Sequence, residues 1–331
     1  MSLSIIKAGL LDTIQDTGRN GYGNWGINPG GAMDNFATQV ANMLVGNCCS
    51  EPVIEMHFPA PQILFEQNVL FAVTGGNFNP TLDDESIPLW HPIVARKNTV
   101  LHFPKLNYGA TCYLSIHGGF CVEKWLNSYS THLKAGAGGC EGRPLKKGDE
   151  ISTKESSIYF ARLLEQKKNV RVLPWQADVR KIYKQPHEIM VIAGHEWQSL
   201  QKESQTDFLN AEYSIHPSSD RMGYQLKGPS LQLEHKIELL SSAVHFGTIQ
   251  LIHDGQMIIL MADHQTTGGY PRIGHVISAH IPKLAQLRPG DRLRFKIVDM
   301  DTAEQLLLEQ EQELKILQRA CLSRLNDLVL C

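Results

Sequence analysis

The sequence predicts a mainly β protein made of two tandem β-barrel domains, with short helices and one C-terminal helix. Short apolar β runs separated by turns fill residues 52–120, which favours a barrel or sandwich over a wound α/β sheet. A turn into a strand at 143–151 recurs at 287–293, and a Gly-Gly pair precedes each copy. This weak duplication predicts domains at residues 1–165 and 166–331; chance similarity of barrel hairpins is the alternative.

Composition excludes several classes of function. The 331 residues are 42% hydrophobic and carry a formal charge of -3 without a basic run, so nucleic acid is not an expected partner. No apolar run approaches the roughly 18 residues that span a bilayer. The seven cysteines form no C-x-x-C pair and the N-terminus lacks a signal-peptide pattern, so we expect free thiols in the cytoplasm. Scattered histidines predict no metal site.

The first half begins with a short strand within residues 5–14. A glycine-rich loop at 15–31 then leads into a helix that starts near Asp34 and ends at Gly46. The free amides of a helix N-terminus suit an anion. The spacing matches neither a P-loop nor a dinucleotide fingerprint, so no motif predicts ATP binding by this chain alone.

The second half opens with strands at 170–173 and 189–193, followed by a helix at 197–208. Asp220 and Arg221 then lie beside a glycine between two strands. They form either a functional pair or an internal ion pair that pins a loop. After residue 300, apolar residues at helical spacing predict an amphipathic helix that packs on its own chain.

The stretch at 263–274 carries more polar groups than a turn requires. It lies between the apolar runs 257–262 and 276–279, so we expect a hairpin. Its adjacent glycines permit positive φ and leave amides open to a ligand. A purely structural barrel hairpin is the alternative.

Five ordered motifs resemble those of the allophanate hydrolase subunit 2 family, also described as biotin-dependent carboxyltransferase-like proteins and as the C subunit of bacterial 5-oxoprolinase. They are Q-D-T-G-R at 15–19, P-G-G-A-M-D at 29–34, H-P-S-S-D-R-M-G at 216–223, G-T-I-Q at 247–250 and D-H-Q-T-T-G-G-Y-P-R-I-G at 263–274. The resemblance covers nearly the whole chain and implies that both barrels are cyclophilin-like.

The resemblance also implies an activity and partners. The chain would be an obligatory component of an ATP-dependent 5-oxoprolinase that opens 5-oxoproline to L-glutamate. Its partners would be a KipI-like protein of related fold, the B subunit, and a LamB/YcsF-like protein, the A subunit. ATP, bound with these partners, would phosphorylate the carbonyl oxygen of the cyclic amide before water attacks.

Site residues follow from these motifs as hypotheses. Arginines would clamp a carboxylate or phosphoryl group, and aspartates would orient an arginine or act as base. The candidate catalytic residues are Asp16, Arg19, Asp34, Asp220 and Arg221. The candidate substrate-binding residues are Gln265, Thr266, Thr267, Gly268, Gly269, Tyr270 and Arg272. The sequence departs from the family pattern at His264, often Arg, and at 127–129, often Gly-Ser-Arg.

Two other functions stay open at this point. One is biotin-dependent carboxyl transfer to urea or a related amide; because no M-K-M site is present, biotin would arrive on another protein. The other is a non-catalytic regulator that binds a homologue of the KipI-like protein, which resembles an inhibitor of a sporulation kinase.

Overall fold

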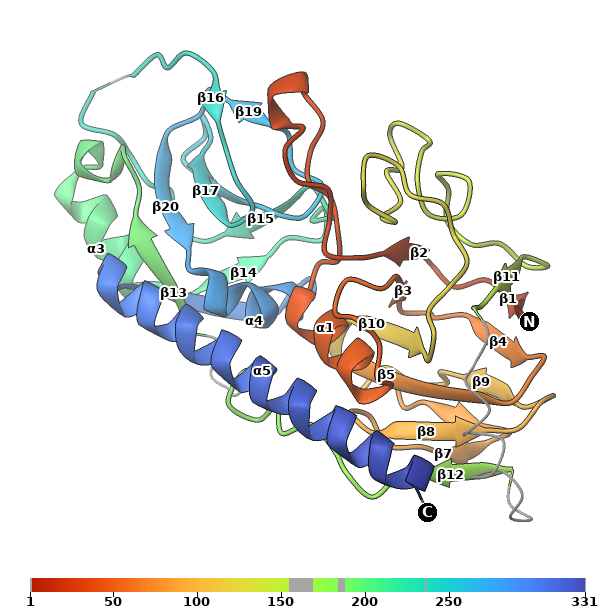
Figure 1. Cartoon of the computed structure of the whole chain (residues 1–331). Helices are drawn as coiled ribbons and strands as arrows, with labels where there is room; N and C mark the ends of the chain where they lie inside the picture. The colour runs from red at the N-terminus through yellow and green to blue at the C-terminus, as the bar shows by residue number, and fades with distance from the viewer. Residues whose placement is uncertain (1, 155–168, 184–187, 236, 331) are drawn as a thin grey trace. The chain divides into compact units, whose positions relative to one another are not determined.

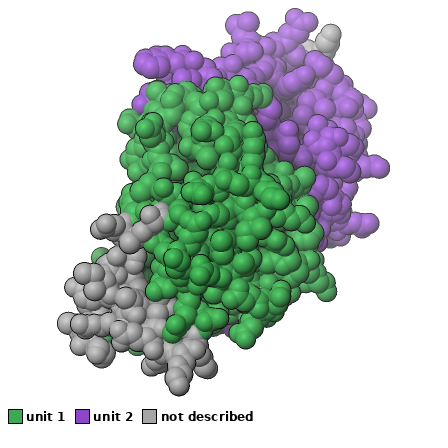
Figure 2. Space-filling model, turned by 90° about the vertical axis from the view of Figure 1, so that its right-hand side faces the viewer, with its two compact units in different colours: residues 1–18, 34–178, 312–331 green, residues 19–33, 179–311 purple. Residues whose placement is uncertain are grey.

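The computed structural model describes residues 2–154, 169–183, 188–235 and 237–330. The predicted mainly β architecture with a C-terminal helix is confirmed (Figure 1). Contacts divide the chain into two compact units, coloured separately in Figure 2. Unit 1 comprises residues 1–18, 34–178 and 312–331, and unit 2 comprises residues 19–33 and 179–311.

This division differs from the single cut predicted between residues 165 and 166, a point that lies outside the described residues. Strand β12 (Val170–Val172), expected to open the second half, pairs with β8 (Pro92–Ala95) of unit 1. The loop 19–33 belongs to unit 2, although both of its flanks belong to unit 1. Local sequence patterns do not specify the unit to which a loop or strand belongs, because tertiary packing decides it.

Unit 1 contains two six-stranded sheets around one apolar core, to which both contribute, for example through Leu3 and Ile14. The first sheet has the order β11 (Glu150–Ser152), β1 (Ser2–Lys7), β4 (Gln62–Phe65), β9 (Val100–His102), β6 (Thr81–Leu82) and β7 (Glu85–Ser86). The second has the order β12, β8, β5 (Val69–Asn77), β10 (Tyr108–Ile116), β3 (Val53–His57) and β2 (Asp12–Gln15).

Helix α1 (Asn35–Leu44) packs against β5 and β10 of this second sheet. Apolar side chains of the strands face the core, so the alternate positions present polar groups to the helix. Thr74 donates to the Ala37 carbonyl at 2.8 Å, and Ser115 donates to Asn42 at 2.6 Å. The sheet therefore has one apolar and one polar face.

Unit 2 is a closed seven-stranded barrel. Its strand order is β13 (Glu188–Ala193), β20 (Arg272–Val276), β17 (Thr248–Leu251), β18 (Met257–Leu260), β15 (Gly223–Lys227), β14 (Tyr213–Ile215) and β21 (Arg292–Ile297). Parallel pairing of β13 with β21 closes the barrel, while its other pairs are antiparallel. Phe208 stacks on Phe295 inside the core, with ring centroids 4.5 Å apart.

Helices accompany both units. The helix predicted at 197–208 is interrupted: η2 (Trp197–Ser199) precedes α3 (Lys202–Asn210). Unit 2 also contains η1 (Gly23–Trp25), η3 (Ser278–His280) and α4 (Ile281–Ala285). The predicted C-terminal helix is α5 (Met300–Leu330). Among the described residues, no helix combines the length and apolarity needed to cross a membrane.

The stretch at 263–274 does not form the expected hairpin. Strand β17 lies between β18 and β20, so the intervening chain crosses over a strand. Within this connection, β19 (Thr267–Gly268) pairs with β16 (Ser242–Ala243) as a separate ribbon. Neither Gly268 nor Gly269 has a positive φ. Gly268 instead permits close approach, because a Cβ there would lie 2.5 Å from Gln250 Nε2.

Candidate functional site

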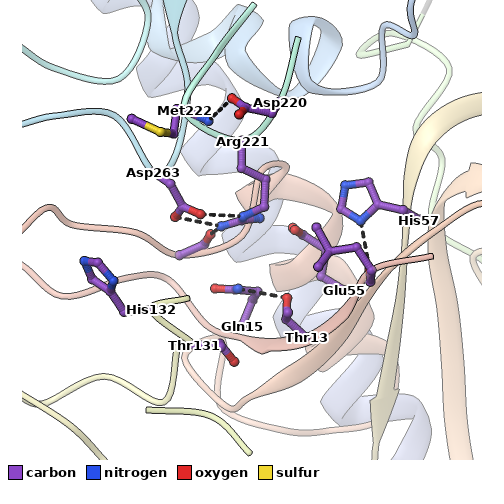
Figure 3. Close-up of polar contacts among 12 residues, drawn as sticks. Thr13, Gln15, Glu55, His57, Thr131, His132, Asp220, Arg221, Met222 and Asp263 are labelled. Carbon is purple, nitrogen blue, oxygen red and sulfur yellow. Dashed lines mark hydrogen bonds and ion pairs between the residues drawn. The ribbon is translucent and has the colours of Figure 1, made fainter. Parts of the chain in front are cut away.

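Arg221 and Asp263 form a largely buried ion pair in unit 2. Arg221 Nε donates to Asp263 Oδ2 at 2.8 Å, and Nη2 donates to Oδ1 at 3.1 Å. Nη2 also donates to the Gly31 carbonyl at 2.7 Å. The two side chains are 6% and 20% exposed, so solvent screens the pair only weakly. Figure 3 shows the guanidinium of Arg221 turned toward Asp263.

Backbone pairing fixes this arrangement. The amide of Asp263 donates to the Arg221 carbonyl at 2.8 Å, and that of Met261 donates to Met222 at 3.0 Å. Asp220 does not pair with Arg221: its Oδ1 accepts from the amides of Met222 at 2.8 Å and Gly223 at 3.2 Å. The alternative of an internal ion pair between Asp220 and Arg221 is therefore wrong: Asp220 stabilises a turn, and Arg221 pairs with Asp263.

The loop 19–33 brings a second arginine to the same place in unit 2. Arg19 is 2% exposed, and its amide donates to the Pro29 carbonyl at 2.7 Å. A Cβ on Gly30, whose φ is 59°, would lie 2.9 Å from Arg19 Nη1 and 3.8 Å from Asp263 Oδ1. The left-handed backbone at position 30 therefore favours glycine, and a Cβ there would require the end of the Arg19 side chain to shift. Arg19, Arg221 and Asp263 form what we call the arginine cluster.

Asp16 lies in unit 1 and is fully hydrogen-bonded. Its Oδ1 accepts from the amide of Gly18 at 2.8 Å and from the hydroxyls of Ser128 at 2.7 Å and Ser130 at 2.5 Å. Its Oδ2 accepts from the Tyr129 amide at 2.7 Å. These donors stabilise the carboxylate and tie residues 128–130 to the start of the glycine-rich loop. This geometry supports an organising role for Asp16.

Asp34 caps helix α1, and its Oδ1 accepts from the Ala37 amide at 2.9 Å. The Asp34 carboxylate thus binds the N-terminus of α1, the place where the sequence suggested that an anion could bind. The Asp34 amide donates to Tyr113 Oη at 2.9 Å, and that hydroxyl donates to Glu55 at 2.9 Å. Burial, followed by the charges of Glu55 and Asp34, raises the pKa of Tyr113 well above its ordinary value, so the phenol stays a donor.

Arg272 occupies a second ion pair in unit 2. Its Nη2 donates to Glu196 Oε1 at 3.1 Å, its amide donates to Glu196 Oε2 at 2.8 Å, and Nη1 donates to Ser242 at 2.9 Å. Burial raises the pKa of Glu196, but the hydrogen bonds from Arg272 outweigh it and hold that pKa below its usual value. The structure thus places Arg272 outside the arginine cluster.

The other predicted binding residues surround the ribbon of β16 and β19. The Thr266 carbonyl accepts from the Val244 amide at 3.1 Å, and Gln265 Nε2 donates to Gln250 Oε1 at 3.4 Å. Thr267 and Tyr270 are exposed; Tyr270 contacts the ring of His253 edge-on. His264 is buried, which lowers its pKa, and its Nδ1 lies 2.5 Å from the Gln265 carbonyl.

Sequence reasoning missed several of these groups. Asp263 belongs to the stretch singled out above but received no role, and Glu55 and Tyr113 lie within the short β runs of residues 52–120, for which no role was predicted. A charged residue within an otherwise apolar strand, such as Glu55 in Val-Ile-Glu-Met, is a signal that could have found one of them. Among the described residues, no three His, Cys, Asp or Glu side chains are arranged to hold a metal ion.

Comparison with known proteins identifies relatives that match most of the chain. The C subunit of 5-oxoprolinase from Haemophilus influenzae is 36% identical over 299 residues, covering 90% of this chain and 92% of that protein. The C subunit of 5-oxoprolinase from Escherichia coli is 36% identical over 313 residues, covering 94% and 95%. The urea amidolyase of Saccharomyces cerevisiae is 30% identical, but the match spans 98% of this chain and only 18% of that protein.

Solved structures agree on the fold. The crystal structure of the K. lactis urea amidolyase superposes with a TM-score of 0.85 at 28% identity over 96% of this chain, which spans a fifth (20%) of that protein. The Kluyveromyces lactis urea carboxylase gives 0.83 at 27% identity, covering 96% of this chain and 29% of that one. The family model described as "Carboxyltransferase domain, subdomain A and B" matches residues 25–297. The chain therefore belongs to the carboxyltransferase-domain family that comprises subdomains A and B, which confirms the resemblance seen in its motifs.

Proposed function

We propose that this chain is the C subunit of a 5-oxoprolinase, which opens 5-oxoproline to L-glutamate together with the KipI-like and LamB/YcsF-like proteins. The observation that supports this proposal most directly is the 36% identity to two proteins of that name, over at least 90% of both chains in each comparison. We further propose that the reaction depends on ATP, bound with these two partners, and that this chain is obligatory for turnover.

The arginine cluster suits this substrate. Arg19 and Arg221 both belong to unit 2. Their positive charges would attract the one carboxylate of 5-oxoproline or a phosphoryl group. Asp263 holds the fork of Arg221 in one orientation through two hydrogen bonds, and the Gly31 carbonyl fixes Nη2. Such preorganisation lowers the cost of orienting a charged group during the reaction.

The chemistry balances in three steps. The lactam oxygen attacks the γ-phosphorus of ATP, and the bond to ADP breaks. Water adds to the ring carbon; the C–N bond then breaks, with the nitrogen taking a proton, and leaves an acyl phosphate. A second water releases phosphate and glutamate. Negative charge develops on oxygen during these steps, which arginines and backbone amides would stabilise.

Omission of single proteins tests the proposal. This chain is purified with its KipI-like and LamB/YcsF-like partners, and glutamate release from 5-oxoproline and ATP is measured with each component left out in turn. Activity that requires all three chains supports the assignment. Full activity without this chain would overturn it.

A second function has its own support. The urea amidolyase fold match, with a TM-score of 0.85, and the family description both favour carboxyl transfer from carboxybiotin to a urea-like acceptor. ATP hydrolysis that depends on biotin and urea, in a mixture that does not open 5-oxoproline, would favour this alternative.

A further inference from the structure

Unit 2 contains an open cavity whose lining includes no member of the arginine cluster. Its volume is about 850 Å³, which lies within the roughly 300 to 1,000 Å³ of small-molecule sites in proteins. Its walls come from described residues between 230 and 239, from 251–255 and from 269–271. All three segments belong to unit 2, so the cavity is complete within one compact unit.

Hydrogen bonds between these segments fix the walls of the cavity. The amide of Leu231 donates to the Gly255 carbonyl at 2.9 Å, and the amide of Leu251 donates to the Pro271 carbonyl at 2.9 Å. The side chains of Leu231 and Leu251 are buried, so they add apolar surface to the lining. The cavity is therefore formed before a ligand binds.

Two rings and two carboxylates complete the lining. The rings of His253 and Tyr270 meet edge to face, with centroids 5.2 Å apart, and both residues remain exposed. A planar ligand can therefore contact them. Glu238 and Asp254 supply acceptors, and among the described lining residues none is Lys or Arg. This chemistry suits a flat, uncharged ring that carries hydrogen-bond donors.

We propose that this cavity binds the adenine base of ATP. The inference rests on the proposed function, in which ATP is the second substrate. A purine has two apolar faces that match the leucines and the rings, and its amino group donates hydrogen bonds that a carboxylate accepts. The triphosphate lies outside the cavity, because two carboxylates repel it and the described lining supplies no cation to hold it.

The course of the chain supports a separate place for each substrate. Gly269 and Tyr270 line the cavity, whereas Asp263 pairs with Arg221 in the arginine cluster. Gly269, Tyr270 and Asp263 all belong to the stretch 263–274 that the sequence predicts to bind substrate. One end of this stretch thus borders a site suited to an anion, and a later part borders a site suited to a base.

Photolabelling of the complex of all three proteins with 8-azido-ATP tests the site directly. The label should appear in peptides that contain residues 251–255 or 269–271, and excess ATP should prevent it. Label that ATP displaces only from other peptides, or the absence of any label that ATP displaces, would overturn the proposal.

Kinetics of the same complex supply a second test. Tyr270→Ala should raise KM for ATP by about five- to fiftyfold, because the base loses an aromatic contact, and should change KM for 5-oxoproline less than twofold. Tyr270→Phe keeps the ring and should stay within twofold of wild type. Tyr108→Ala is the matched control, because Tyr108 is an exposed tyrosine of unit 1. An unchanged KM for ATP in Tyr270→Ala would contradict the contact.

The wild-type complex separates this inference from the function on which it rests. A wild-type complex that opens 5-oxoproline but carries label only elsewhere would refute the adenine site alone. A complex that does not open 5-oxoproline would refute the proposed function.

Discussion

Asp12 gives the chain a pH-dependent stability that can be worked out from the structure. The residue begins strand β2 and is 1% exposed. Its Oδ2 accepts from the Gly9 amide at 2.6 Å, and its Oδ1 has no partner among the described residues. Burial raises the pKa of Asp12 from 3.8 to about 7, against the opposing hydrogen bond from Gly9.

The sign follows from linkage. Asp12 binds its proton more tightly in the folded than in the unfolded protein. The stabilisation that comes from this protonation is therefore complete below pH 3.8 and is lost as the pH rises to about 7. Each unit of separation between the two pKa values corresponds to about 1.4 kcal/mol. Between pH 5 and pH 8, wild type should therefore lose about 2 to 3 kcal/mol relative to Asp12→Asn, which does not titrate.

Thermal unfolding at pH 5 and pH 8 measures this difference. The gap between Asp12→Asn and wild type should widen by roughly 5 to 10 °C at the higher pH. Asp84→Asn, which removes the same charge at an exposed position of unit 1, serves as the control. A gap of constant size over this pH range would refute the argument that Asp12 folds in its protonated form.

Three further predictions concern unit 2. Burial, and then the charge of a nearby lysine, lowers the pKa of His280 to about 4. The free energy of unfolding should therefore decrease as the pH is lowered from 6.5 to 4, and His280→Gln should remove this component of the acid denaturation curve. Glu196→Gln should destabilise by about 2 kcal/mol in urea, because it leaves a partly buried arginine without its charged partner; an unchanged midpoint would contradict this. Gly30→Ala should displace Arg19 and lower turnover at least tenfold. Gly21→Ala is the control, because it introduces backbone strain but its Cβ would have nothing within 4 Å. Equal turnover by the two variants would contradict the prediction.

The sequence alone predicted the β character because alternation and turn residues are local properties. It did not predict which strands are neighbours. The apolar runs at 257–262 and 276–279 were expected to form a hairpin, yet β17 lies between the strands β18 and β20 that border this stretch. Period-two patterns specify the face of each residue, but the order of strands in a barrel depends on non-local packing. The same limit explains why the loop 19–33 was not assigned to unit 2.

In the candidate site, too, local patterns indicated single residues but not their non-local partners. Arg221, predicted as a catalytic residue, is buried and paired with Asp263, and its catalytic role stays a prediction. An ion pair with the adjacent Asp220 was one of two alternatives, but the Asp220 carboxylate instead accepts from the backbone amides of Met222 and Gly223. The true partner, Asp263, lies 42 positions away. Arg19 was also selected, but its proximity to Asp263 arises from the backbone course of residues 29–31, which sequence does not specify.

The most direct measurement of the central claim is 5-oxoproline turnover by the complex of all three proteins with Arg221→Lys. Lysine keeps the positive charge but cannot reproduce the fork that contacts both Asp263 oxygens and the Gly31 carbonyl. Arg292→Lys is the control, because Arg292 forms an exposed ion pair with Glu212 in the same unit. The account predicts at least a hundredfold loss of kcat/KM for Arg221→Lys, with thermal unfolding still cooperative, and less than a twofold change for the control. Wild-type turnover by a folded Arg221→Lys complex would contradict it.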